Sequence, residues 1–227
     1  MFVAPRPYFV PPKLDDPTLI CHYLDTSVHS TGNDSSGNAH TGVTSGIAWG
    51  YGGRAVLNNA SSSFRVPDHA DLRVLDDLTV RCWTKNATTD DAVFSRYDTG
   101  TDDRSWSIQM SGTGLFSLTV SDDGTADAGH RKVYNSTVAY NDDEWHQLGF
   151  TFATGTLLMY MDGAEVAPTK TVDAAITAIH AGTTDLMLGC YLTNDVEAIL
   201  LAGSLACCGM WSEVKAESWF AEDYARR

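Results

Sequence analysis

The stretch Ser105-Trp106-Ser107-Ile108-Gln109-Met110-Ser111 alternates large apolar residues with small polar ones, and Gly112-Thr113-Gly114 follows it directly. Successive side chains of a β-strand point to opposite faces, so this alternation places the three apolar groups on one face. The glycines tolerate the positive φ angles of a tight turn. Beyond them the same alternation continues with Phe116, Leu118 and Val120. The stretch therefore predicts a half-buried antiparallel hairpin.

The same pattern recurs along the chain. Residues 146–152 and 156–161 flank Ala153-Thr154-Gly155 and predict a second hairpin, and Asp162-Gly163 after them is a strong two-residue turn signal. Further strands are expected at 63–66, 78–84, 92–96, 186–191 and 199–211. Many short strands with no helix between them predict an all-β fold, a two-sheet antiparallel sandwich. Only residues 212–224 read as a helix, which we expect to cover one sheet edge.

Length and charge limit the classes of protein and partner. A chain of 227 residues suits one domain, which we place at residues 20–227, preceded by an arm at residues 1–19. The net charge of −14 repels phosphate backbones and anionic lipid headgroups, so nucleic acid is not an expected partner. The longest apolar run, residues 198–203, is far shorter than the roughly 18 residues of a membrane span. We expect no membrane insertion.

The first residues and the cysteines indicate where the protein is made. Met1-Phe2-Val3-Ala4-Pro5-Arg6-Pro7 lacks a basic segment followed by an apolar one, so we expect no secretion signal and synthesis in a host cytoplasm. The cysteines are five, an odd number without framework spacing. We expect them to be reduced core residues that form no disulfide.

The arm holds five of the seven prolines, which favour an extended chain and lack the N–H group that sheet pairing requires. Such a segment is well suited to contact another subunit, because its prolines reduce the entropy lost on ordering. The candidate assembly contacts are aromatic or basic: Phe2, Arg6, Tyr8, Phe9 and Lys13.

Seven segments occur in an order that resembles one known family. They are residues 34–40 (Asp34-Ser35-Ser36-Gly37-Asn38-Ala39-His40), 53–56, 64–68, 78–83, 144–148, 157–163 and 188–189. The sequence resembles the laminin-G-like, concanavalin-A-like lectin/glucanase jelly-roll family over about residues 20–225. The resemblance implies two curved antiparallel sheets, with Trp83 and Trp145 in packing roles, and it implies no catalytic residue.

The residues themselves also argue against an enzyme. Retaining glycoside hydrolysis needs two carboxylates about 5–5.5 Å apart, which a strand supplies with acids two or four residues apart. Here nearly every acid falls in a turn, as in Asp90-Asp91 and Asp122-Asp123. His146 alternates with Leu148 and Phe150, which indicates a hydrogen-bonded core histidine. We expect no catalytic residue.

Calcium is the one cofactor that the residues suggest, because hard cations prefer oxygen-rich loops such as Asp98-Thr99-Gly100-Thr101-Asp102-Asp103. The candidate donors are Asp34, Asp98 and Asp102. Members of the resembled family often carry an acid in the last long strand for this purpose, but the sequence has Ala206 at that place. The expectation is therefore no cofactor, with calcium as the alternative.

Two functional classes remain. The first is a structural protein of a virion, a phage-like capsid decoration or tail component that is anchored by its arm to other subunits, with a homo-oligomer expected. The second is a lectin-like module that binds surface glycans and mediates adhesion, in which aromatic rings stack on sugars. The candidate rings are Tyr51, Tyr97, Trp106 and Tyr191, and their alternative role is core packing.

Overall fold

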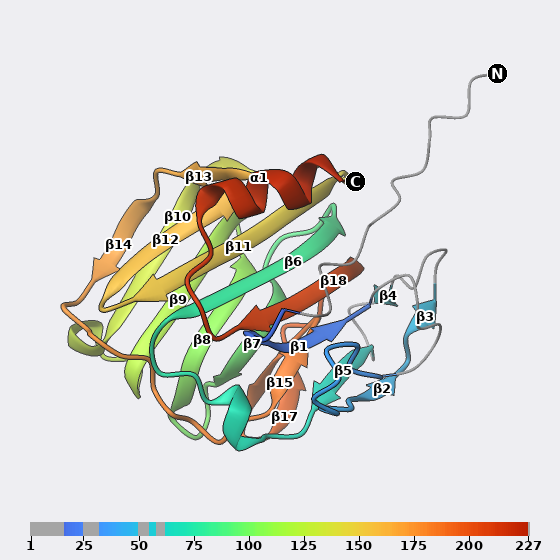
Figure 1. Cartoon of the computed structure of the whole chain (residues 1–227), viewed down its shortest axis with the longest axis horizontal. Coiled ribbons are helices and arrows are strands. Elements are labelled where there is room, and N and C mark those ends of the chain that lie inside the picture. Colours follow the sequence, from blue (N-terminus) through green and yellow to red (C-terminus); the bar gives the residue numbers. More distant parts are fainter. Residues whose placement is uncertain (1–15, 25–31, 50–54, 58–61, 227) are drawn as a thin grey trace.

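The computed structural model describes the chain except for residues 1–15, 25–31, 50–54, 58–61 and 227. Two antiparallel sheets pack face to face (Figure 1). The first sheet has the order β13-β12-β11-β6-β18-β4-β3, and β1 also pairs with β18. Its strands are β1 Leu19–Tyr23, β3 Ala48–Trp49, β4 Ala55–Leu57, β6 Leu78–Asn86, β11 Trp145–Ala153, β12 Thr156–Met161, β13 Ala164–Val166 and β18 Gly203–Trp211.

The second sheet has the order β14-β10-β9-β8-β7-β15-β5-β2, and a hairpin of β16 and β17 joins it beside β7. Its strands are β2 Val43–Ser45, β5 Ser63–Val66, β7 Asp91–Asp98, β8 Asp103–Met110, β9 Leu115–Gly124, β10 Arg131–Ala139, β14 Thr169–Asp173, β15 Leu186–Leu188, β16 Tyr191–Thr193 and β17 Val196–Ala198. Two short 3-10 helices, η1 Ala70–Leu72 and η2 Ala128–His130, lie in the connections. The predicted jelly-roll sandwich is confirmed.

The core lies between the sheets and is centred on Trp106. Its ring in β8 meets Phe94 of β7 at 5.2 Å between centroids, and Phe150 of β11, in the other sheet, at 5.6 Å. All three side chains are at most 1% exposed. Burying an aromatic ring of roughly 200 Å² stabilises a fold by about 5 kcal/mol before entropy is counted, so this contact is a main source of sheet-to-sheet cohesion.

The predicted hairpins are confirmed, but the polar faces of their strands are less exposed than alternation suggests. Ser95 and Ser107 face away from the core and are nevertheless fully buried. The Ser95 hydroxyl donates to the Cys190 carbonyl, and Ser107 accepts from the side chain of Gln109. A second apolar cluster, Met187, Cys190 and Leu192, lies in the same region of the sheet. The strand expected at 186–191 is divided between β15 and β16, and β1, β4, β10, β13, β14 and β17 were not predicted.

Among the described residues, six aspartates occupy turns with positive φ, a conformation that Asp and Asn tolerate better than most residues. They are Asp77, Asp90, Asp102, Asp143, Asp162 and Asp195. The predicted Asp162-Gly163 turn is among them, between β12 and β13. Its carboxylate accepts from His146 Nδ1 at 2.8 Å and from the backbone of Gln147. The His146 side chain is mostly buried and hydrogen-bonded, as expected.

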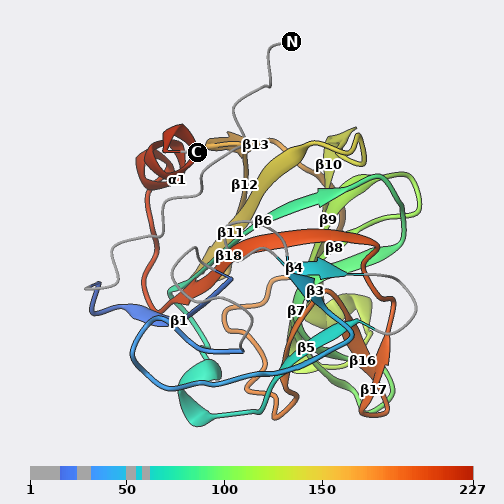
Figure 2. The ribbon, with the colours of Figure 1, turned by 90° about the vertical axis from the view of Figure 1, so that its right-hand side faces the viewer.

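The C-terminal helix α1, Glu217–Ala225, lies against the outer face of the first sheet and not along its edge, which corrects the expectation (Figure 2). Phe220 stacks on Tyr160 at 4.0 Å and Tyr224 stacks on Trp83 at 5.6 Å. Gly149 makes this packing possible, because a Cβ there would meet Phe220 at 2.6 Å. In the described part of the chain, no helix has the length and apolar character needed to cross a membrane.

A buried ion pair fastens the helix to the sheet. Arg81 of β6 is fully buried, and its guanidinium donates to Asp223 of α1 at 3.1 Å and to the Cys207 carbonyl at 2.6 Å. The rings of Trp211 and Trp219 lie 5.5 and 5.7 Å from the guanidinium carbon. The other oxygen of Asp223 accepts from Gln147 of β11 at 2.7 Å. The two charges therefore neutralise each other within the protein, and of the Arg81 guanidinium only Nε has no hydrogen-bond partner among the described residues.

All five cysteines are free and buried, in agreement with the sequence-based expectation. Cys207 and Cys208 sit where the pairing of β18 with β6 shifts register, between Ala206 and Gly209. Cys207 packs with Trp83 in the cluster beneath the helix, whereas Cys208 belongs to the main core. Burial raises the pKa of Cys190 to about 12, so this thiol is held in its protonated, unreactive form.

Replacing Asp223 should destabilise the fold strongly. Asp223→Ala leaves the buried Arg81 charge without its carboxylate, and loss of one partner of a buried pair costs about 3–5 kcal/mol. Glu222→Ala on the same helix is the matched control, because Glu222 pairs with Arg226 at the surface and such pairs contribute about 0–1 kcal/mol. Urea unfolding of the two variants measures the difference. Equal stabilities would show that the Arg81 pair does not hold the helix.

Candidate functional site

A cleft of about 380 Å³ opens at one end of the second sheet, where three connections meet. They are the β7–β8 turn, the segment before β15, and the β16–β17 turn. Its lining is strongly polar: Asp98, Thr101, Asp102, Asp103, His180, Thr183, Thr184 and Asp195. The volume lies in the range of small-molecule sites, roughly 300–1,000 Å³.

Asp98 holds two walls of the cleft together. Its Oδ1 accepts from the backbone N–H groups of Gly100 at 2.8 Å, Thr101 at 3.3 Å and Asn194 at 2.9 Å. Its Oδ2 accepts from the backbone of Asp195 at 2.8 Å. Burial alone would raise the pKa of Asp98, but these N–H groups outweigh it and the pKa lies below its ordinary value. Both oxygens are therefore engaged in positioning the turns.

Asp102 and Asp103 leave the same turn toward different partners. Asp102 pairs with Arg104, whose guanidinium also donates to the Gly124 carbonyl at 3.0 Å. Asp103 Oδ2 accepts from the Thr183 backbone at 2.9 Å, and its Oδ1 lies 3.2 Å from His180 Nε2. The Asp102 side chain is 67% exposed and the Asp103 side chain 18%, so the Asp102 carboxylate is the more available of the two to a ligand.

The buried Arg96 holds in place the segment that contributes Thr183 and Thr184 to the cleft. Its side chain is 1% exposed, and its Nη2 donates to the carbonyls of Gly182 and Thr184, both at 2.9 Å. The same nitrogen lies 2.7 Å from Asp68, and Nη1 donates to the Leu72 carbonyl. Burial lowers the pKa of Arg96, although Asp68 opposes that shift. The guanidinium thus ties the segment before β15 to η1.

The candidate sugar-stacking residues differ in how far they are exposed. Trp106 is at the centre of the core, so its proposed role in glycan binding is wrong. Tyr97 is 7% exposed and lies under Tyr191, with ring centroids 5.8 Å apart. Tyr191 is partly exposed, and Arg104 lies over the Tyr97 ring at 5.8 Å, which links the tyrosine pair to the cleft through Asp102. Tyr51 lies outside the described residues.

The candidate calcium donors are not brought together as one set. Asp98 and Asp102 both line the cleft, but Asp34 belongs to the connection after β1 and is absent from the lining. Asp34 accepts from the backbone N–H groups of His22, Ser36 and His40, which accounts for both of its oxygens. Two of the three proposed donors, Asp34 and Asp98, therefore use their carboxylates to accept hydrogen bonds from backbone N–H groups in turns.

Sequence reasoning missed part of the cleft lining. His180, Thr183 and Thr184 come from a segment without strand periodicity, and Asp195 lies in a turn that had not been separated from its flanking strands. The only available signal was the cluster of acids in the turn at 98–103. The candidate assembly contacts, Phe2, Arg6, Tyr8, Phe9 and Lys13, lie outside the described residues.

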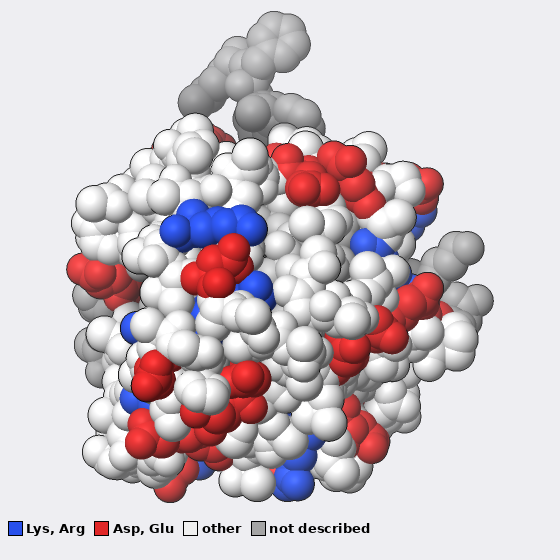
Figure 3. Space-filling model, turned by 90° about the vertical axis from the view of Figure 1, so that its left-hand side faces the viewer, with Lys and Arg blue, Asp and Glu red and all other residues white. Residues whose placement is uncertain are grey.

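On one side of the molecule, Asp and Glu form several separate groups, with Lys or Arg beside some of them (Figure 3). The cleft itself is lined by four aspartates and one histidine, with Arg96 and Arg104 behind it. This arrangement favours ligands with hydrogen-bond donors and disfavours anions.

Fold and cleft together define a jelly-roll sandwich of the lectin type with a polar site at its rim. Residues 58–212 match the concanavalin A-like lectin/glucanases superfamily. The match covers more than half of the chain, which therefore belongs to this family. Among curated proteins, none matches the sequence significantly.

Solved structures with the same fold include two kinds of domain. Domain 4 of AbnA, an extracellular arabinanase from Geobacillus stearothermophilus solved with arabinotriose, is 19% identical with a TM-score of 0.66, covering 91% of this chain and 98% of that one. The botulinum neurotoxin serotype D binding domain is 11% identical with a TM-score of 0.65, covering 92% and 51%. A structure of botulinum neurotoxin type C is 9% identical with a TM-score of 0.66, and cell entry of that toxin is described as dependent upon interaction with two ganglioside molecules. The chain spans about half of the toxin structures.

Asp98 should make a pH-dependent contribution to stability. Asp98→Asn removes the negative charge that four backbone N–H groups face and replaces one acceptor oxygen by an NH₂ group. We expect this to lower the free energy of unfolding by about 1–3 kcal/mol near pH 7. Because the folded pKa lies below the unfolded one, the difference between wild type and variant is full above the unfolded value, about pH 4, and disappears as the pH falls through the folded pKa. Denaturant unfolding between pH 7 and 2 measures it. A difference that grows on acidification would contradict this role.

Proposed function

We propose that this chain is a carbohydrate-binding module and that the cleft at the rim of the second sheet takes a neutral oligosaccharide. The observation that carries the proposal is the cleft lining, in which Asp102, Asp195 and Thr183 converge from separate connections. Membership of a lectin-type family and the arabinotriose complex of domain 4 of AbnA support it.

The chemistry of the lining suits sugar hydroxyls. Ionised carboxylates only accept hydrogen bonds, sugar hydroxyls donate them, and such charge-assisted bonds are stronger than neutral ones. Asp102 is exposed, and its geometry is held by Arg104, so little ordering is needed when a ligand arrives. The Tyr191 ring, linked to this edge through Tyr97 and Arg104, offers an apolar face for a sugar ring.

The charge of the cleft selects against acidic sugars. A sialic or uronic acid would bring a carboxylate into a cleft that already contains four aspartates, in a protein of net charge −14. Like charges at such distances repel, and the buried Arg96 is already engaged with protein acceptors. Neutral hexoses and pentoses carry no such penalty.

The proposal includes the absence of turnover. Asp98 is used by four backbone donors and Asp103 by Thr183, which leaves these two carboxylates in structural roles. The expected role in a virion assembly stays a prediction, because its five contact residues lie outside the described part of the chain.

The test is calorimetric titration with neutral oligosaccharides selected from a glycan array, with acidic glycans alongside them. We expect 1:1 binding of a neutral glycan and no release of product. Asp102→Asn keeps a residue that tolerates positive φ and removes the charge, and it should weaken binding about tenfold, the value of a charge-assisted hydrogen bond.

Asp143→Asn is the matched control. Asp143 also occupies a turn at positive φ and pairs with a basic residue, Lys85, but it does not line the cleft. Its replacement should leave binding unchanged. If neither variant affects an observed affinity, the cleft is not the sugar site, and if the whole array stays blank the module does not bind carbohydrate.

A further inference from the structure

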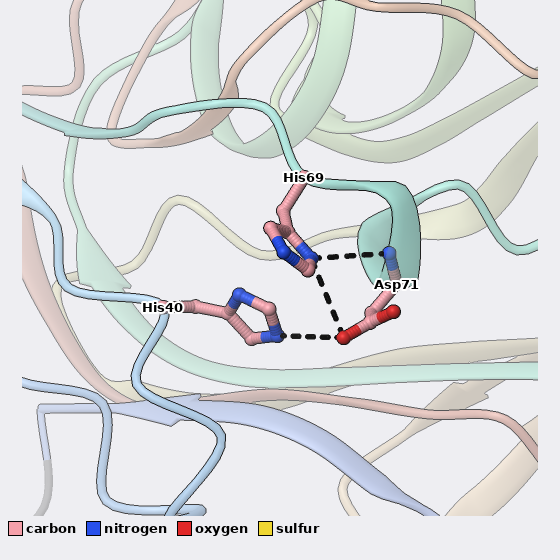
Figure 4. A group of neighbouring side chains, drawn as sticks. All are labelled: His40, His69 and Asp71. Atoms are coloured by element: carbon pink, nitrogen blue, oxygen red, sulfur yellow. Dashed lines mark hydrogen bonds and ion pairs between the residues drawn. The ribbon is translucent and has the colours of Figure 1, made fainter.

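Three metal-ligating side chains from two separate connections meet beside η1 (Figure 4). Asp71 Oδ2 lies 3.3 Å from His69 Nδ1 and 3.8 Å from His40 Nε2. His40 comes from the connection between β1 and β2, whereas His69 and Asp71 come from η1 and the residue before it. The two imidazole rings lie 4.8 Å apart between centroids. None of these residues belongs to the cleft lining.

The buried member of the group is His40. Its side chain is 4% exposed, and its Nε2 has no hydrogen-bond partner among the described residues. Leaving such a nitrogen unpaired costs free energy unless something binds it. Figure 4 shows that Nε2 points toward Asp71, but 3.8 Å is too long for a hydrogen bond.

The backbone holds His40 firmly in this orientation. Its N–H donates to Asp34 Oδ2 at 3.2 Å, and its carbonyl accepts from the Tyr23 hydroxyl at 2.6 Å. Tyr23 is itself buried and packs edge-on against Phe64 at 5.1 Å. The ring is therefore held by a rigid base, while the side chains of His69 and Asp71 are 57% and 62% exposed. His69 Nδ1 accepts the Asp71 N–H at 3.3 Å, a long bond that an ion bound to this nitrogen would replace.

We propose that His40, His69 and Asp71 bind a divalent transition-metal ion of the Zn²⁺ type. Imidazole nitrogens suit Zn²⁺, whereas Ca²⁺ and Mg²⁺ prefer sets made of oxygen alone. All donor atoms lie within 4.8 Å of one another. A zinc ion with ligands at about 2.0–2.2 Å places neighbouring donors roughly 3.3–3.6 Å apart, so the observed spacing needs only a small closure.

The proposed ion has an open position and a mechanical effect. Three protein ligands leave the fourth tetrahedral position to water or to an oxygen of a ligand, and it faces solvent on the side of the two exposed residues. The ion also joins the connection at residues 33–42 to η1. This inference stands apart from the proposed carbohydrate site, since it uses none of the same residues.

The test is titration of tag-free, chelator-treated protein with Zn²⁺ by calorimetry, and with Co²⁺ by visible absorption. We expect one ion per chain, an absorption spectrum typical of tetrahedral Co²⁺ with nitrogen and oxygen ligands, and no comparable binding of Ca²⁺. His69→Ala and Asp71→Asn change exposed side chains and should leave the fold intact, which circular dichroism checks. Each should weaken Zn²⁺ binding at least tenfold.

His130→Ala is the matched control. His130 lies with Asp122 and Asp123 in the other group of comparable composition among the described residues, and its Nδ1 is hydrogen-bonded to Asp122 at 3.0 Å, but unlike the group of His40 this group has no buried member. Its replacement should not change the affinity. The proposal is overturned if wild type binds no Zn²⁺ stoichiometrically, if His69→Ala and Asp71→Asn bind as tightly as wild type, or if only His130→Ala loses the ion.

Discussion

The buried guanidinium of Arg96 is the constraint on which the end of the molecule with the candidate sites depends. A charge that is 1% exposed has to be satisfied by protein atoms, and Arg96 finds its acceptors on two pieces of chain: Asp68 and Leu72 on one, Gly182 and Thr184 on the other. These pieces have no sheet pairing to position them. Because the fork of donors is rigid, it sets where η1 and the segment before β15 lie.

Both candidate sites inherit their geometry from that arrangement. Thr183 and Thr184 reach the cleft because the carbonyls on either side of Thr183 are bonded to Arg96. His69 and Asp71 lie between Asp68 and Leu72, which are bonded to the same group. The sandwich supplies a rigid base, as Trp106 and Phe150 illustrate, and the connections at its rim carry the polar groups that can meet a ligand.

The sequence predicted the sheets better than the site for a physical reason. Alternation reports which side of a strand is apolar, so residues such as Ile108 and Leu148 were assigned to the core correctly. It does not report what covers the other side, which is why the buried Ser95 and Ser107 were not foreseen, nor the helix packed over Arg81. Trp106 was a candidate for glycan binding because residue type alone does not distinguish an aromatic ring buried in a core from one exposed in a binding site. The cleft was beyond reach, since Asp98 and Asp195 are brought together by hydrogen bonds between turns nearly a hundred positions apart.

The aspartates at positive φ bear on the acidity of the chain. In the part of the chain that the structure describes, six turns use Asp where the backbone adopts a left-handed conformation, so part of the excess of 29 acids over 15 bases comes from how the chain reverses direction. Asparagine accepts the same dihedral angles without a charge. The same six residues thus set the path of the backbone and contribute negative charge, and an Asp-to-Asn change at one turn can alter the charge without altering the path. Asparagine at all six turns would change the net charge from −14 to −14 + 6 = −8 while the strands keep their order, so the chain stays acidic for reasons beyond its turns.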